Sequence, residues 1–233
     1  MEPADKQALS SWRVALRDRR APAIIDLAIV ALVFVADWHH LIYFSKTPYL
    51  LALGWLSLRV RGLGWRSVGF TRPQNWLRTL QLGLLAGLAI EGLELFVTQP
   101  LLVHLTGKYP DLTELGQARG NFNMLLLLLA ATWSLAAFGE ELVWRGYILN
   151  RVSDLVGRSS VGIALALTIV SVAFGLAHAD QGLTGVVENI IDGALLGLLY
   201  LLAGRNLWLP IVAHGMTDTV DSLLLYLGWY PGM

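Results

Sequence analysis

Residues 122–146 read FNMLLLLLAATWSLAAFGEELVWRG, an apolar run of membrane-spanning length that closes on two adjacent glutamates and an arginine. A helix needs about 20 apolar residues to cross the ~30 Å hydrocarbon core of a bilayer. A carboxylate near the middle of that core costs on the order of 3 kcal/mol. Glu140 and Glu141 therefore indicate that this helix does more than cross a membrane.

The composition of the whole chain favours an integral membrane protein. Of its 233 residues, 55% are hydrophobic and 15% are charged, against about 25% charged residues in soluble domains. The net charge is zero, so the chain as a whole has no attraction to nucleic acid. The absence of cysteine excludes disulfides, thiolate nucleophiles and cysteine-ligated metals. We expect the lipid bilayer as a partner and no nucleic acid.

Further apolar runs of similar length recur along the chain. They predict an all-α fold, a polytopic transmembrane helical bundle of about seven spans at residues 23–44, 48–63, 76–99, 122–144, 159–178, 183–203 and 207–227. The second run is the weakest, because its uncharged part covers only residues 48–58. The chain then divides into a basic N-terminal segment (1–22), N-terminal helices and connectors (23–121) and a catalytic core (122–227) that carries the polar anomalies.

Lysine and arginine alternate between the two sides of this predicted bundle. Fourteen of them lie on the side of the N-terminus and three on the other side. The positive-inside rule then places the N-terminus in the cytoplasm and favours a multi-pass protein of the plasma (inner) membrane. Residues 62–73 become a cytoplasmic connector and residues 100–121 the longest outer loop. Leu9, Trp12 and Leu16 recur at helical spacing, so the first segment is a surface-lying helix or a basic tail.

The two adjacent glutamates differ in their helical surroundings. Glu141 precedes Arg145 by four residues, which is the favourable spacing and order for a helical ion pair. Glu140 is rotated away by about 100° and has no cation at that spacing. We therefore expect Glu141 to hold Arg145, and we expect Glu140 to act as a general base on water.

Two later apolar runs carry further polar residues at helical spacing. Phe174 precedes His178 by one turn, so the two rings can pack together. His214 and Asp218 are four residues apart, and an aspartate so placed can fix the tautomer of an imidazole. Taken singly, each histidine is explained at least as well by a structural role. Three helices that each bear unlikely polar groups favour one buried catalytic site, to which Glu140 also contributes.

The three motifs, in this order, resemble those of the CAAX-protease and bacteriocin-processing family of intramembrane proteases. They are Glu140-Glu141-x-x-x-Arg145, Phe174-x-x-x-His178 and His214-x-x-x-Asp218. The resemblance covers residues 122–227 and implies a peptide or protein substrate in or at the membrane. It also implies that Glu140 and His178 activate water, and that His214 and Asp218 stabilise the oxyanion. Many members carry asparagine at the last position, so the resemblance leaves the role of Asp218 open.

Other intramembrane acids lack a histidine or arginine at matching spacing. Glu188 and Asp192 lie four residues apart in the sixth apolar run. Because acids inside a membrane indicate function by default, these two are possible lining residues of a substrate cleft. Glu91 and Glu94 in the third run have a weaker claim to the same role.

The sequence leaves the cofactor open. Two histidines and a carboxylate can hold zinc with one position free for water, which makes Glu140, His178 and His214 candidate metal ligands. The same three residues can equally activate water without a metal. Zinc is therefore possible, and the chemistry does not require it.

Three functions compete at this level. The first is an intramembrane endopeptidase that cleaves membrane-associated, C-terminal or leader peptides. A small proton-coupled transporter could use the same groups as a relay, but transporters usually show paired repeats, and this sequence shows none. A catalytically idle immunity or binding protein of the same fold is weakened because every expected polar position is filled.

The predicted span boundaries raise one difficulty for a shared site. They place Glu140 near the inner end of its helix and His178 near the outer end of the next. A common site therefore requires the helix that contains Glu140 to slide outward or tilt.

Overall fold

The computed structural model describes residues 20–232, and within that range the regular elements are all helical. The all-α prediction is confirmed over these residues. The helix or tail predicted around Leu9, Trp12 and Leu16 lies outside the described residues.

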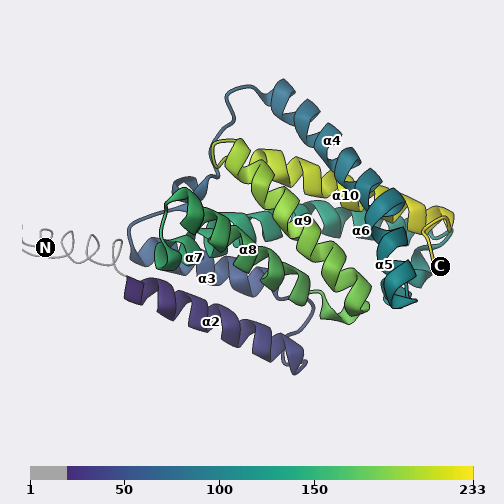
Figure 1. Ribbon diagram of the computed structural model, residues 1–233, viewed down its shortest axis with the longest axis horizontal. Coiled ribbons are helices and arrows are strands. Elements are labelled where there is room, and N and C mark those ends of the chain that lie inside the picture. The colour runs from purple at the N-terminus through teal and green to yellow at the C-terminus, as the bar shows by residue number, and fades with distance from the viewer. Residues whose placement is uncertain (1–19, 233) are drawn as a thin grey trace, which may run out of the picture.

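The helices follow the predicted apolar runs (Figure 1). In chain order they are α2 (Arg20–Trp38), α3 (Thr47–Val60), α4 (Trp76–Leu93), α5 (Gln99–Thr106), α6 (Phe122–Ala131), α7 (Leu149–Val156), α8 (Ser160–Leu176), α9 (Gly182–Leu202) and α10 (Trp208–Leu227). Three π-helical segments join α4 to α5 and α6 to α7, at Glu94–Thr98, Thr132–Glu140 and Leu142–Ile148. Short 3₁₀ helices occur in the connectors, at Trp65–Val68, Thr113–Ala118 and Ala179–Gln181.

Four helices of the described range are long and apolar enough to cross a membrane. They are Arg20–Trp38, Trp76–Thr106, Phe122–Val156 and Ala179–Leu202. The helix α8 is apolar but has 17 residues, and α3 has 14, which is a length of about 21 Å at 1.5 Å per residue. These helices indicate a multi-pass membrane protein, and the total of seven spans stays a prediction.

Several predicted runs end at residues other than the ends of the helices, and the run predicted at 122–144 continues as helix to Val156. The run predicted at 76–99 continues as helix to Thr106, so the outer connection begins later than the predicted loop at 100–121. Pro100 lies in the first turn of α5, directly after the π-helical segment Glu94–Thr98. Because proline lacks an N–H and crowds the preceding turn, a regular helix would break here, whereas the wider π turn lets the helix continue. The first run was also drawn too long, since α2 ends at Trp38.

Close packing holds α10 against α4. A Cβ atom added to Gly83 would lie 2.6 Å from the Val212 side chain, and one added to Gly87 would lie 2.4 Å from the backbone oxygen of Ala213. Small residues let membrane helices approach to backbone contact in this way. The contact fixes α10, which carries two of the predicted site residues, beside the helix that leads to Glu94.

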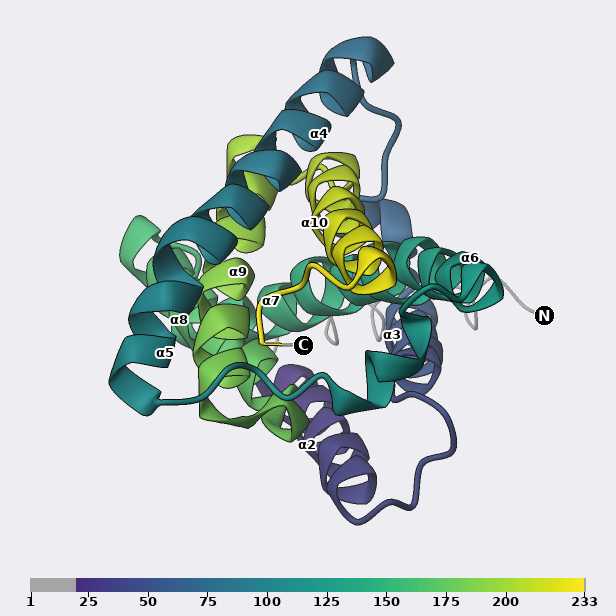
Figure 2. The ribbon, with the colours of Figure 1, turned by 90° about the vertical axis from the view of Figure 1, so that its right-hand side faces the viewer.

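The helix that contains the two glutamates runs through the bundle. Figure 1 shows α2 at one edge and α4 at the opposite edge, with α7 to α10 between them. In Figure 2, α10 lies between α4 and α6, in agreement with the contacts it makes to both. Large apolar side chains point outward over the surface, with Leu85 63% and Phe96 81% exposed. Such a surface is suited to lipid and not to water.

Candidate active site

Glu140 and Glu141 lie where two π-helical segments meet. One segment ends at Glu140 and the next begins at Leu142. Isolated π turns inside a helix occur frequently at functional sites, because they re-aim side chains that a regular helix would point elsewhere. Here Glu140 is half-buried and lines a cavity, while Glu141 is 0% exposed and points into the bundle. Neighbouring residues of the same type therefore occupy different surroundings.

The carboxylate of Glu141 joins two of the three motifs. Its Oε1 atom accepts a hydrogen bond from Arg145 Nη1 at 2.6 Å and lies 2.9 Å from Nδ1 of His214. The ion pair expected from the spacing of four is thus present. Arg145 also donates to the backbone oxygen of Gly193 at 3.2 Å, and its guanidinium lies 4.7 Å from the centre of the Phe174 ring. The buried arginine is held by charge, by hydrogen bonding and by a cation–π contact.

The bond between Glu141 and His214 has no signal in the sequence, because the two residues are 73 positions apart. Sequence reasoning assigned the orientation of His214 to Asp218. In the structure Asp218 Oδ1 lies 3.5 Å from His214 Nε2, so Glu141 is the closer partner. A carboxylate on Nδ1 fixes the ring and leaves Nε2 directed toward Asp218 and the cavity. The corrected geometry gives Glu141 two partners where one was expected.

His178 lies directly after α8, at the start of a 3₁₀ turn. Its Nδ1 lies 2.8 Å from the backbone oxygen of Phe174, and its ring packs on the Phe174 ring with centroids 4.8 Å apart. Because a carbonyl oxygen can only accept, Nδ1 must carry the hydrogen. The neutral ring then has its free lone pair on Nε2, and the side chain lines the cavity. This is the tautomer that a proton acceptor needs.

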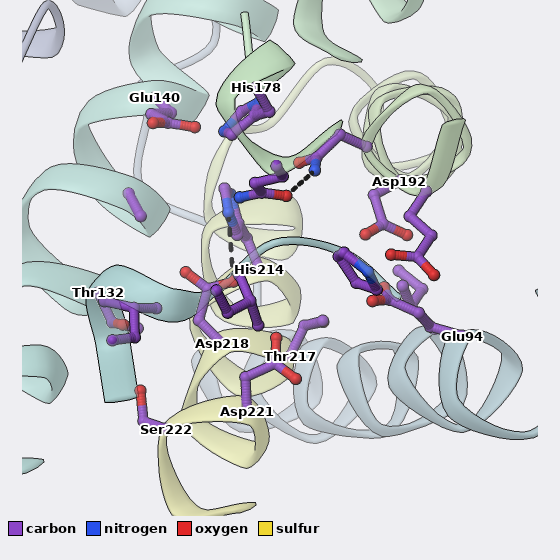
Figure 3. Close-up of a pocket in the computed structure, with 18 of the residues that line it drawn as sticks. Glu94, Thr132, Glu140, His178, Asp192, His214, Thr217, Asp218, Asp221 and Ser222 are labelled. Atoms are coloured by element: carbon purple, nitrogen blue, oxygen red, sulfur yellow. Dashed lines mark hydrogen bonds and ion pairs between the residues drawn. The ribbon is translucent and has the colours of Figure 1, made fainter. Parts of the chain in front are cut away.

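One cavity of 220 Å³ contains all four predicted catalytic side chains among its lining residues. Figure 3 shows them on the walls of the cavity: Glu140, His178, His214 and Asp218. The difficulty raised by the predicted span boundaries is thereby removed, because Glu140 and His178 line the same cavity. Within the described residues, Glu140 forms no ion pair and no side-chain hydrogen bond, so its carboxylate is available to water or substrate.

The far side of the same cavity is acidic. The possible cleft residues Glu188 and Asp192 line it, and so do Glu94 and Asp221. Glu91 is 2% exposed and is not among the residues that line the cavity. Asp221 was not among the predicted site residues. Its signal is its position seven residues after His214, which places both on one face of α10.

The candidate zinc ligands do not form a preformed metal site. Among residues 20–232, no group of three or more His, Asp or Glu side chains is arranged to hold a metal ion. His214 Nδ1 is occupied by the carboxylate of Glu141, and His178 Nδ1 by a backbone oxygen. The Nε2 atoms of both rings stay free, and the chemistry proposed below is written for protein side chains and water.

Comparison with known protein families gives a match over part of the chain. The model of the family described as type II CAAX prenyl endopeptidase Rce1-like matches residues 122–220. Residues 122–220 are Rce1-like. This Rce1-like segment contains all three motifs, from Glu140 to Asp218, so the resemblance predicted from the motifs is confirmed over these residues. No curated protein and no solved structure matches the chain. The apolar helices indicate a multi-pass membrane protein, and the Rce1-like segment is a part of it.

Proposed function

We propose that the protein is an intramembrane endopeptidase in which Glu140 activates water. One observation supports this most directly: a segment similar to a protease family places a carboxylate without an ion-pair partner and two histidines around one cavity inside apolar helices. The substrates would be membrane-associated, C-terminal or leader peptides, which can reach such a cavity from the bilayer.

The proposed reaction begins with a water molecule between Glu140 and His178. Glu140 accepts a proton from the water, and the water oxygen attacks the scissile carbonyl carbon. In its doubly protonated form, His214 donates from Nδ1 to Glu141 and from Nε2 to the oxyanion that forms, with Asp218 as a neighbouring hydrogen-bond partner. The C–N bond then breaks, and the proton on Glu140 moves to the leaving amine.

The role of Asp218 follows from charge. An ionised carboxylate facing an oxyanion would repel it, so Asp218 acts either in its protonated form or through its contact with His214. The 3.5 Å separation from Nε2 is close enough for such a contact once substrate is bound. Hydrogen bonding, and not negative charge, is therefore the property that this position requires.

The topology belongs to the same proposal: about seven spans, with a cytoplasmic N-terminus, in a plasma (inner) membrane. The chain has no cysteine, so each introduced cysteine is a unique reporter. We expect Gln117→Cys to react with a membrane-impermeant thiol reagent in intact cells, and Ser67→Cys to react only after permeabilisation. The opposite pattern would contradict the orientation.

The test of function is cleavage by the purified protein in liposomes. A mixed library of apolar peptides is incubated with the wild-type protein, and new peptide ends are detected by mass spectrometry. The proposal predicts discrete cleavage sites. The six acids that line the cavity would also suit a proton relay, so a pH-sensitive dye inside the liposomes records proton movement in parallel. Proton movement without cleavage would favour the transporter.

A further inference from the structure

The cavity holds far more negative than positive groups. Six of its lining residues are carboxylic acids, none is lysine or arginine, and the two histidines lie at the catalytic end. Figure 3 shows Glu94 and Asp192 together at one side of the cavity, away from Glu140 and His178. We call the four acids at this side the acidic wall: Glu94, Glu188, Asp192 and Asp221.

The acidic wall lacks the hydrogen bonds that buried carboxylates need. Glu188 is 4% exposed and lines the cavity, and its Oε1 has no hydrogen-bond partner within the described chain. Both carboxylate oxygens of Glu91 and the Oδ1 atom of Asp221 are also buried without a hydrogen-bond partner within the described chain. Ionised carboxylates cannot donate to one another, so these unpartnered oxygens require a proton or a cationic donor.

A cationic group would satisfy this wall better than any other ligand. Buried carboxylates without partners are costly, and an ammonium or guanidinium group supplies several donors together with the missing charge. A free C-terminal carboxylate would instead meet four acids. The 220 Å³ cavity is below the roughly 300 Å³ of small drug-binding pockets. It therefore suits a side chain or a short peptide segment.

We propose that the acidic wall is a substrate subsite for a lysine or arginine side chain close to the scissile bond. The preferred substrate is then an internal peptide segment with a basic residue, and a free C-terminal carboxylate at this position is rejected. This inference rests on the proposed function, since it places the subsite in the same cavity as Glu140. It concerns recognition, however, and binding can be measured without cleavage.

The experiment measures peptide binding to the Glu140→Gln variant in lipid nanodiscs. The probes are acetyl-Leu-Ala-X-Leu-Leu-amide peptides in which X is lysine, norleucine or glutamate. The lysine peptide is expected to bind at least about tenfold more tightly than the norleucine peptide, and the glutamate peptide most weakly. Adding Glu188→Gln and Asp192→Asn should abolish the preference. Adding Asp37→Asn, a carboxylate outside the cavity that pairs with Lys46, should preserve it.

The outcomes separate this inference from the proposed function. Equal binding of the three peptides, or no binding of any, would overturn the subsite. Cleavage by the wild-type protein without preference for lysine would also overturn it, while the endopeptidase assignment would stand. Preferential binding of the lysine peptide without cleavage would support the subsite and contradict the endopeptidase. Melting temperatures of all variants exclude misfolding as the cause.

A second, separate pocket gathers arginines. It has a volume of 440 Å³ and lies where the end of α3, the following connector, α7 and the α9–α10 turn meet. We call the arginines that line it the arginine cluster: Arg61, Arg66, Arg151, Arg158 and Arg205. They come from distant parts of the sequence, so only the fold brings them together.

The charges of the arginine cluster are not balanced within the described chain. Arg61 pairs with Asp26, and Arg151 and Arg158 share the carboxylate of Asp154, at 2.9 and 2.6 Å. Five arginines therefore face two carboxylates. Arg61 Nη1 and Arg151 Nε are buried without a hydrogen-bond partner, in residues that are 4% and 6% exposed. Donors so placed require an acceptor.

We infer that this pocket binds a phosphate-bearing anion. Arginine forks match phosphate geometry, and all five arginines lie on the side predicted to be cytoplasmic, where anionic lipid headgroups are found. The phosphate could come from a lipid headgroup or from a soluble compound. In both cases it would bridge the segments around α7 and so stabilise the helix that carries Glu140 and Glu141.

The test compares melting temperatures in nanodiscs of phosphatidylcholine with and without phosphatidylglycerol, and with inorganic phosphate added. Stabilisation by phosphatidylglycerol alone identifies a lipid site, and stabilisation by inorganic phosphate identifies a soluble ligand. Arg66→Gln with Arg205→Gln should abolish the effect, whereas Arg78→Gln, an exposed arginine outside the pocket, should retain it. The inference would be overturned if neither anion raised the melting temperature, or if Arg78→Gln lost the stabilisation as fully as the double variant.

Discussion

Replacement of Glu141 by glutamine tests how the site is held together. The side chain is 0% exposed and contacts Arg145 at 2.6 Å and His214 at 2.9 Å. Glutamine keeps the shape and an accepting oxygen but removes the charge, which leaves Arg145 as an unpaired buried cation. Breaking a buried pair costs about 3–5 kcal/mol. The retained acceptor and the contacts of Arg145 with Gly193 and Phe174 place the expected loss at the lower end, about 3 kcal/mol.

The assay is thermal unfolding of purified variants in one detergent. A loss of 1 kcal/mol lowers Tm by about 2–4 °C for chains of 150–250 residues, so Glu141→Gln should melt about 6–12 °C below the wild type. The matched control is the double variant Glu141→Gln with Arg145→Met, which removes the stranded charge and should recover most of the loss. The reasoning would be refuted if Glu141→Gln had the same Tm as the wild type. It would also be refuted if the double variant had a Tm no higher than that of Glu141→Gln.

Four further variants, at three positions, test other parts of the site and fold. His178→Ala should lower peptide cleavage by about 10²-fold or more, the scale of a lost acid–base group, and a smaller loss would make its role structural. Asp218→Asn should keep most of the activity and Asp218→Leu little, and an inactive asparagine variant would show that charge is needed. Gly87→Val should lower Tm, because its side chain would meet the backbone oxygen of Ala213, and unchanged Tm would contradict the α4–α10 packing.

Local features of the site could be predicted because helical spacing determines them. The pair of Glu141 with Arg145 and the stacking of Phe174 on His178 both join residues four apart. The assignment of different surroundings to Glu140 and Glu141 also follows from rotation around one helix.

Features that depend on packing between helices could not be predicted. The contact of Glu141 with His214 joins distant parts of the chain, and nothing in either local sequence encodes it. The acidic wall collects residues from α9, α10 and the segment after α4. The π turns were also missed, because one extra residue in a turn leaves no mark in hydrophobic periodicity. The predicted run therefore stops at residue 99, whereas the helix continues through Pro100.

Cleavage by the Glu140→Gln variant tests the central claim most directly. Glutamine keeps the size of the side chain but cannot accept the proton of water at neutral pH. The wild-type protein and the variant are first shown to have the same Tm and are then reconstituted separately in liposomes of the same lipid composition. Both are assayed on the same peptides, and cleavage is measured at the sites mapped with the wild-type protein. The endopeptidase account predicts that the variant folds and inserts normally and loses cleavage by about 10²-fold or more. Equal cleavage by the two proteins would contradict it.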